Sequence, residues 1–240
     1  MSGPVKTDAI VLRSLRYGEA DRILHLYTPG RGRVGAIAKG VRRTRSRFGG
    51  RLEPFSRVRV VCHEGRGELL TITSVETLDA HARLRDAAAT LDSAARACDA
   101  VARVFETEEP HPAVYNLLSN ELALLASDAA NATHANALSF RLKVLVAAGL
   151  VPALGACASC GSPEHLVAFS PQAGGVVCNA CEAGAFPISQ ETHDFMALAL
   201  ASTLAETPEA SNRALREAER AIGETLEHHA HLRLRPAAAR

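Results

Sequence analysis

The chain changes its sequence character near Leu78, and this change sets what it can fold into. Before that point, short segments rich in Val, Ile, Leu and Thr are separated by breaks that mostly contain glycine, which is typical of a small sheet. After it, alanine and leucine recur at steps of three and four residues, which is the pattern of amphipathic helices. The sequence therefore predicts an α+β protein with a β domain over residues 1–80 and a helical domain over residues 81–240.

The first part contains five segments with the pattern of strands. Alternation of apolar and polar residues, clearest around Val58 and Val60, indicates strands with one buried face. Five short strands in about 75 residues fit a closed or nearly closed barrel, and five is the strand count of the OB-fold, although a sandwich fragment or an SH3-like barrel gives a similar pattern. The predicted strands are Thr7–Arg13, Arg22–Thr28, Arg33–Lys39, Ser56–His63 and Leu69–Val75.

The second part has the pattern of a helical bundle. A Gly- and Cys-rich segment at about residues 153–186 interrupts it, and we expect this segment to be an irregular insert. Gly149 and Pro152 mark the end of the helix before the insert. The predicted helices are Leu84–Phe105, Leu117–Leu125, Leu138–Leu150, Gln190–Leu204 and Ser211–Leu232.

Four of the six cysteines form two C-x-x-C pairs, Cys157 with Cys160 and Cys178 with Cys181. The 17 residues between the pairs give the spacing of a four-thiolate zinc site, in which each pair occupies one tight turn. Four thiolates leave no coordination position for water, so the predicted zinc is structural. A redox pair and a catalytic zinc are the alternatives, but the first lacks a strand-then-helix context and the second lacks the H-x-E and P-C-x-x-C signatures.

Basic residues are concentrated between Arg31 and Arg59, where ten of them accompany one acidic residue, Glu53. The chain has 15 Lys and Arg against 8 Asp and Glu up to Ala80, and 12 against 18 after it, so the first part is basic and the second acidic. Arginines that alternate with small residues suit a flexible loop that binds phosphates, whereas an acidic protein partner and simple solubility are the alternatives. The predicted DNA-binding residues are Arg31, Arg33, Lys39, Arg42, Arg43, Arg45, Arg47 and Arg51.

The low aromatic content, 4% with no Trp, argues against base stacking as the main source of affinity, so we expect sequence-independent binding to the DNA backbone. Phe48 either adds an aromatic platform beside the arginines or anchors their loop to the barrel. Nucleotide-cradling and hydrolytic signatures such as G-x-x-x-x-G-K-[ST] and G-x-S-x-G are missing, so we do not expect an enzyme. No run of about 18 apolar residues and no signal-peptide pattern occurs, so we expect a cytoplasmic protein without a membrane partner.

Several motifs together resemble the RecO family of bacterial recombination mediators along nearly the full length. The resemblance implies an N-terminal OB-fold followed by a helical domain with a zinc insert. It also implies a nucleoid-associated role in DNA repair and homologous recombination. The motifs are Tyr17–Arg22, Gly32–Arg33, Ala38–Arg43, Ser46–Gly49, Leu52–Phe55, Phe140–Leu142, Gly149–Pro152, and the two cysteine pairs with Phe169 and Gly174–Gly175 before the second.

Members of this family bind single- and double-stranded DNA, anneal complementary strands, and work with RecR so that RecA replaces single-stranded DNA-binding protein. The resemblance implies these partners, including the acidic C-terminal tail of that binding protein, which some members contact through the helical region. No motif locates the tail site, and Arg141 and Lys143 are candidates by charge alone. A zinc-ribbon transcription or RNA-binding factor and a metal-dependent nuclease are the functional alternatives.

Overall fold

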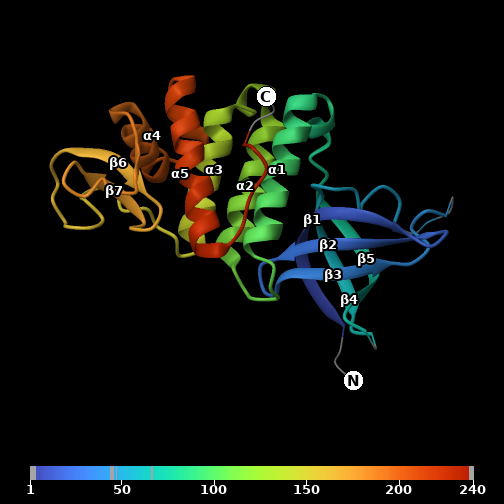
Figure 1. Cartoon of the computed structure of the whole chain (residues 1–240). Coiled ribbons are helices and arrows are strands. Elements are labelled where there is room, and N and C mark those ends of the chain that lie inside the picture. Colours follow the sequence, from blue (N-terminus) through green and yellow to red (C-terminus); the bar gives the residue numbers. More distant parts are fainter. Residues whose placement is uncertain (1–3, 44–45, 47, 66, 238–240) are drawn as a thin grey trace. The chain divides into compact units, whose positions relative to one another are not determined.

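The computed structural model describes residues 4–43, 46, 48–65 and 67–237, and the chain forms two compact units, Met1–Ala129 and Ala130–Arg240. The first unit contains a barrel and two helices, and the second contains three helices and a small sheet (Figure 1). The predicted division at residues 80 and 81 follows sequence character, whereas the compact units follow packing. The two differ because the first two helices pack on barrel strands.

Five strands close a barrel in the first unit (Figure 1). Their order is β1-β2-β3-β5-β4, β4 pairs back on β1, and β3 is parallel to β5. This is the five-stranded arrangement of the OB-fold, so the predicted fold is confirmed. The strands are β1 Val5–Tyr17, β2 Asp21–Thr28, β3 Gly32–Ala38, β4 Arg57–His63 and β5 Leu70–Asp79.

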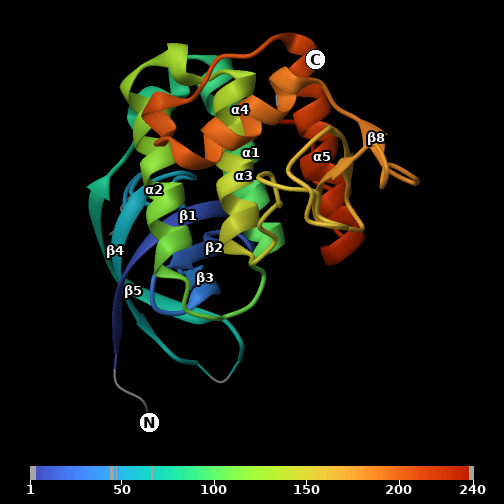
Figure 2. The same cartoon turned by 90° about the vertical axis from the view of Figure 1, so that its left-hand side faces the viewer.

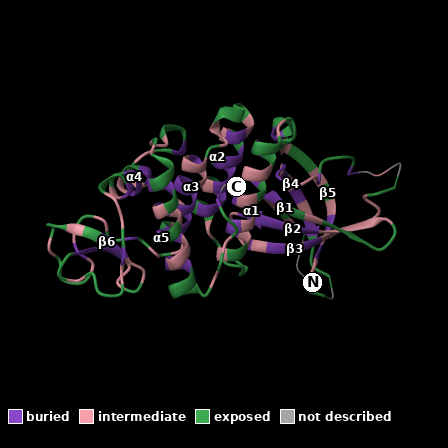
Figure 3. Cartoon of the chain, turned by 45° about the horizontal axis from the view of Figure 1, so that its top comes forward, coloured by how far each residue is buried: buried purple, intermediate pink, exposed green. Residues whose placement is uncertain are grey.

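The barrel core is formed by alternate residues of its strands. Leu24 and Leu26 of β2 and Val58 and Val60 of β4 are fully buried, as the alternation predicted. Figure 3 shows these strands with buried segments in purple and exposed connections in green. The prediction placed the end of the first strand at Arg13, but β1 continues to Tyr17. The added residues pair with β2 as far as the pair of Tyr17 with Asp21.

The helices of the first unit follow the barrel. The predicted start at Leu84 is wrong, because Leu84 lies in a short 3-10 helix and α1 begins at Ala88. The second helix begins earlier than predicted, with Pro112 in its first turn, where a missing N–H costs nothing. The elements are η1 Ala82–Arg85, α1 Ala88–Val104 and α2 Pro112–Ser127, followed by η2 Ala129–Asn131 at the division between the units.

Three helices of the second unit pack on one another (Figure 2). Thr133, Ser189 and Ser211 each accept a hydrogen bond from a backbone N–H in the first turn, which fixes where these helices begin. The helices are α3 His134–Ala147, α4 Gln190–Ala201 and α5 Asn212–Ala230, with η3 Leu204–Glu206 between the last two. No described helix combines the length and hydrophobicity needed to cross a membrane.

The insert between α3 and α4 is more regular than predicted. It contains an antiparallel three-stranded sheet in the order β7-β6-β8, with bounds β6 Leu166–Ser170, β7 Gly175–Cys178 and β8 Phe186–Pro187. These strands have two to five residues, so they are too short to give a clear alternation in the sequence.

Candidate metal centre and nucleic-acid surface

The four paired cysteines come together in the second unit. Their Sγ atoms lie within 4.8 Å of one another, and the Sγ atoms of Cys160 and Cys178 are 3.7 Å apart. A tetrahedral zinc ion with Zn–S distances of about 2.3 Å places its sulfurs about 3.8 Å from each other, so these side chains fit four-thiolate coordination. Among the described residues, this is the one group of cysteine, histidine and acidic side chains close enough to hold a metal ion, and His165 is not part of it.

Each cysteine pair occupies a tight turn, as its spacing predicted. The N–H of Gly161 donates to the carbonyl of Cys157 at 2.8 Å, and the N–H of Cys181 donates to the carbonyl of Cys178 at 2.9 Å. Gly161 has a φ of 77°, which a residue without a Cβ adopts at little cost. Cys178 is the last residue of β7, so the small sheet places the second pair.

The cysteine thiols differ in pKa because their surroundings differ. Backbone N–H groups, that of Cys178 first, lower the pKa of Cys157 to about 6 because they stabilise its thiolate. The thiols of Cys160 and Cys178 raise the pKa of Cys181 to about 12 because they interact with its protonated form. Four adjacent thiolates repel one another, and a divalent cation would offset that repulsion.

The insert buries Phe169, Val176 and Phe186, with the two phenylalanine rings 5.8 Å apart, and a small cluster at its cysteines. The cluster at the four paired cysteines consists of Cys157, Ala168, Val177 and Cys178, with mostly small residues at its edge. So small a cluster gives limited hydrophobic stabilisation to the two cysteine turns, and a bound metal would add to it. The other two cysteines, Cys62 and Cys98, are buried in the first unit, away from this group.

The predicted DNA-binding residues fall into two groups that β3 separates. Arg31 and Arg33 lie at its start, and Lys39, Arg42, Arg43 and Arg51 follow its end. Arg45 and Arg47 lie outside the described residues. The structure therefore does not bring the whole predicted set into one cluster.

Arg31 and Arg33 make contacts within the first unit. Arg31 forms ion pairs with Glu64 at 3.2 Å and with Glu108 at 3.0 Å. Nη1 of Arg33 donates to the carbonyl of Ala102 at 2.9 Å, in the last turn of α1. These two guanidiniums hold loops and a helix end beside the barrel, so their contacts serve the fold of the first unit.

Replacing Arg33 by Ala is expected to destabilise the first unit by about 2 kcal/mol, because a partly buried hydrogen bond from a charged donor is lost. Urea unfolding would measure this as a lower midpoint. The salt dependence of DNA binding should stay as in the wild type, whereas Arg42→Ala should reduce that dependence and leave the midpoint unchanged. An Arg33→Ala variant with an unchanged midpoint and a reduced salt dependence would show instead that Arg33 contacts DNA.

Lys39, Arg42, Arg43 and Arg51 are exposed on the connection between β3 and β4, residues 39–56. The N–H of Arg42 donates to the carbonyl of Ala20 at 2.9 Å, and its Nη1 donates to the carbonyl of Glu19 at 3.0 Å. These contacts place the connection against the turn between β1 and β2. We call the four exposed cations the barrel basic surface.

Phe48 anchors this connection. Its side chain is only 1% exposed and belongs to the barrel core, so of the two predicted roles the structural one is correct. The prediction omitted two exposed arginines, Arg13 and Arg16, which lie on β1 beside the same turn. No alternation of buried and exposed residues marks this end of β1, so no local pattern identifies them.

Arg141 and Lys143 of α3 both donate hydrogen bonds to backbone carbonyls within the second unit. Arg141 is 6% exposed and donates through Nη2 to the carbonyl of Arg235 at 2.6 Å. Nζ of Lys143 donates to the carbonyl of Ser202 at 2.6 Å, and burial lowers the pKa of this lysine. Both charged groups therefore serve as hydrogen-bond donors to carbonyl groups of the same unit.

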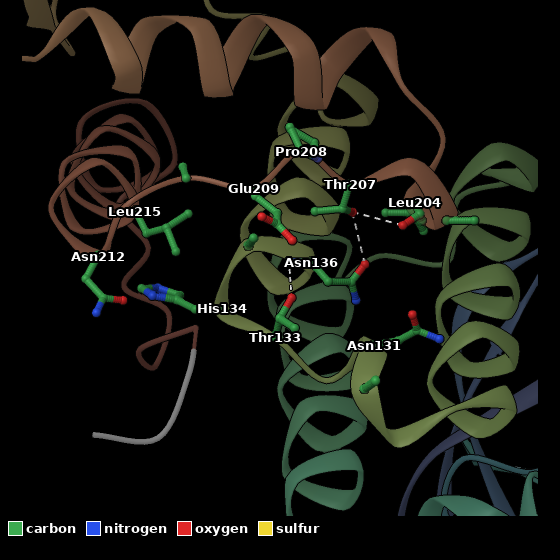
Figure 4. Close-up of a pocket in the computed structure, with 14 residues that line it drawn as sticks. Asn131, Thr133, His134, Asn136, Leu204, Thr207, Pro208, Glu209, Asn212 and Leu215 are labelled. Carbon is green, nitrogen blue, oxygen red and sulfur yellow. Dashed lines mark hydrogen bonds between the residues drawn. The ribbon is translucent and has the colours of Figure 1, made fainter.

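The second unit also contains a pocket of about 510 Å³ between the start of α3 and the segment that leads into α5 (Figure 4). The Thr207 hydroxyl donates to Oδ1 of Asn136 at 3.4 Å and to the carbonyl of Leu204 at 2.9 Å on its wall. His134 also lines it and is paired with Glu219. None of the described residues that the sequence singled out lines this pocket.

Comparisons with known proteins agree with this arrangement. Residues 1–81 match the family described as Recombination protein O N terminal, and residues 86–236 match Recombination protein O C terminal. The DNA repair protein RecO of Rubrobacter xylanophilus is 41% identical over 90% of this chain and 88% of its own. Those of Anaeromyxobacter sp. (strain Fw109-5) and Nocardioides sp. are each 37% identical, over 98% and 93% of this chain and 94% and 93% of their own. The matches cover both the barrel and the cysteine insert, and the chain belongs to the RecO family of DNA repair proteins.

Proposed function

We propose that this protein is a recombination mediator that binds single- and double-stranded DNA, anneals complementary strands and helps RecA replace single-stranded DNA-binding protein. The observation that carries the proposal is the barrel basic surface, Lys39, Arg42, Arg43 and Arg51, exposed on an OB-fold barrel. OB-folds commonly bind oligonucleotides, and membership of a DNA repair family makes DNA the natural polyanion.

The mechanism is binding without bond-making. Exposed guanidinium and ammonium groups neutralise phosphates and release counterions, which lowers the repulsion between two DNA strands. The hydrogen bonds of Arg42 to the carbonyls of Glu19 and Ala20 fix the base of this surface, so its cations are held in one region. The nearby acidic residue Glu53 is paired with Arg22 at 3.0 Å, which reduces its effect on an approaching phosphate.

We further propose that Cys157, Cys160, Cys178 and Cys181 hold one structural zinc ion. A zinc ion bound by four thiolates supplies folding energy and no open coordination position. The short Sγ–Sγ spacing, the two tight turns and the small core of the insert support this assignment.

The proposed partners are RecR and the acidic C-terminal tail of single-stranded DNA-binding protein, with RecA acting afterwards on the exposed strand. The family assignment supports this set of partners. The acidic character of the chain after Ala80 suits protein contacts better than direct contacts with DNA.

Neutralising the arginine run Arg42, Arg43, Arg45 and Arg47 with Gln is expected to weaken binding of all DNA sequences by similar factors, because backbone contacts carry no base information. For single strands, the slope of log affinity against log salt concentration should shrink by roughly 0.7 for each lost contact. Fluorescence anisotropy with labelled oligonucleotides over a range of salt concentrations measures both quantities.

The matched control replaces Arg213 and Arg216, which are exposed on α5, by Gln and is compared with Arg42→Gln/Arg43→Gln. Both double variants lose the same charge, so a difference between them reports position and not net charge. Equal affinities and slopes for the two would place the DNA surface elsewhere.

A further inference from the structure

The outward face of β1, β2 and β3 is covered over one part and open over the other. Ile10 of β1 pairs with Tyr27 of β2, and Tyr27 pairs with Arg33 of β3. Ile10 and Tyr27 are fully buried, and Arg33 bonds to the end of α1. The covered part of the face therefore lies beside the helices of the first unit.

The open part begins after a bulge in β1. The register between β1 and β2 shifts between Val11 and Arg13, so one extra residue is absorbed and Arg13 points outward as Ile10 does. Leu15 and Tyr17 follow at steps of two on the same face. Leu15 is 36% exposed and Tyr17 is 54% exposed, so two large side chains lie close together at the surface of this face.

An apolar row crosses this open part. Leu15 pairs with Ile23 of β2, which pairs with Ile37 of β3, and directly paired residues share a face. With strands about 4.8 Å apart, the row is about 10 Å wide, the size of a nucleobase. The side chain of Leu69 lies against Gly35 of β3, since a Cβ built on Gly35 would be only 2.6 Å from Cδ2 of Leu69. Leu69 therefore extends the apolar row.

Basic residues lie at both edges of the open face, and one acidic residue, Asp21, pairs with Tyr17 at the far edge. Arg13 pairs with His25, whose pKa is lowered by burial and by the charges of Arg33 and Arg13, so its imidazole is neutral at pH 7. At the far edge, the N–H of Gly40 donates to Oδ1 of Asp21 at 2.7 Å, which brings the barrel basic surface beside the turn that follows Tyr17.

We infer that this open face stacks unpaired bases, with Tyr17 as the aromatic contact, and so makes the protein prefer single-stranded to double-stranded DNA. The inference rests on the proposed function, because it assumes that DNA binds the neighbouring cations. A single strand held there by its phosphates can turn its bases onto Tyr17 and Leu15, whereas the bases of a duplex are already paired and stacked. The surrounding positive charge favours a nucleic acid over an apolar protein surface as the occupant.

Tyrosine fluorescence gives a direct test. The chain has three tyrosines and no Trp, and Tyr27 and Tyr115 are buried, so Tyr17 is the exposed emitter. An oligo(dT) strand should quench the emission of the wild-type protein, and a blunt duplex of the same charge should quench it far less. The Tyr17→Phe variant should lose the quenching and keep its affinity, because Phe stacks equally well.

Affinity gives the second measurement. Tyr17→Ala is expected to weaken oligo(dT) binding about tenfold and to leave duplex binding within about twofold, since one base–aromatic contact contributes on the order of 1–3 kcal/mol. The matched control is Leu91→Ala, which removes an exposed apolar side chain from α1 and should change neither affinity.

The outcomes separate this inference from the proposed function. If the wild-type protein binds neither form of DNA, both are wrong. If it binds both forms and loses them when Arg42 and Arg43 are neutralised, but Tyr17→Ala changes both affinities equally or not at all, the stacking inference alone is overturned.

Discussion

Replacing Cys178 by Ser should remove the bound zinc and unfold the insert at residues 153–186, while the barrel stays folded. The remaining three thiolates bind zinc less tightly, and metal binding supplies on the order of 10 kcal/mol to a segment whose cysteine turns pack on only a small apolar cluster. Metal analysis should give about one zinc per wild-type chain and close to none for the variant. Limited proteolysis should then cut the variant between α3 and α4 at a protease concentration that leaves the wild type intact.

Cys62→Ser is the matched control, because Cys62 is a buried cysteine of the barrel. This variant should lower the stability of the barrel and keep the zinc, which is the opposite pattern. Freshly reduced wild-type protein without zinc would contradict the assignment, and so would a Cys178→Ser variant that retains the metal.

The barrel and the cysteine cluster could be predicted because their signals are local. Val58 and Val60 alternate with polar neighbours within one strand, and each C-x-x-C pair needs only one turn to place two sulfurs. The spacing between Cys160 and Cys178 then allows a short sheet to bring the two turns together.

The division of the basic residues could not be predicted in this way. Arg33 and Lys39 are close in sequence, but an extended strand rises about 3.3 Å per residue, so β3 carries them apart. Arg33 bonds to Ala102, which is 69 residues away, and no local pattern indicates that contact. A count of charges along the chain therefore identified a basic segment without separating its structural members from its exposed ones.

Phe48 and Tyr17 illustrate the same limit for aromatic residues. Phe48 stands among arginines and glycines in the sequence, yet its ring fills the barrel core. Tyr17 lies at the end of a long strand, and its exposure depends on a bulge that no single residue in the sequence indicates. Burial follows from packing between strands, so the sequence alone left the roles of these two rings open.

Annealing of complementary strands coated with single-stranded DNA-binding protein should be accelerated by this protein without ATP. The barrel basic surface screens phosphate repulsion, and the sequence has no phosphate-cradling motif that would couple the reaction to a nucleotide. Screening alone is weak at about 0.15 M salt, because the Debye length is then about 8 Å. Coated DNA at this salt concentration therefore requires recruitment by the coating protein as well as charge.

Two changes should each reduce annealing of coated strands to the uncatalysed rate. The first neutralises Arg42, Arg43, Arg45 and Arg47, which removes the cations proposed to bind DNA. The second deletes the acidic tail of the coating protein, which removes the proposed contact with the helical region. Quenching of a fluorophore pair on the two strands follows the rate.

Bare strands separate the two effects. With uncoated DNA, deletion of the tail has nothing to act on, so only the arginine substitutions should slow annealing. The Arg213→Gln/Arg216→Gln variant should anneal bare strands at the wild-type rate, since its charges lie on α5 and not on the barrel. If annealing of coated strands requires ATP, or survives both changes undiminished, then charge screening combined with recruitment is not the mechanism of this protein.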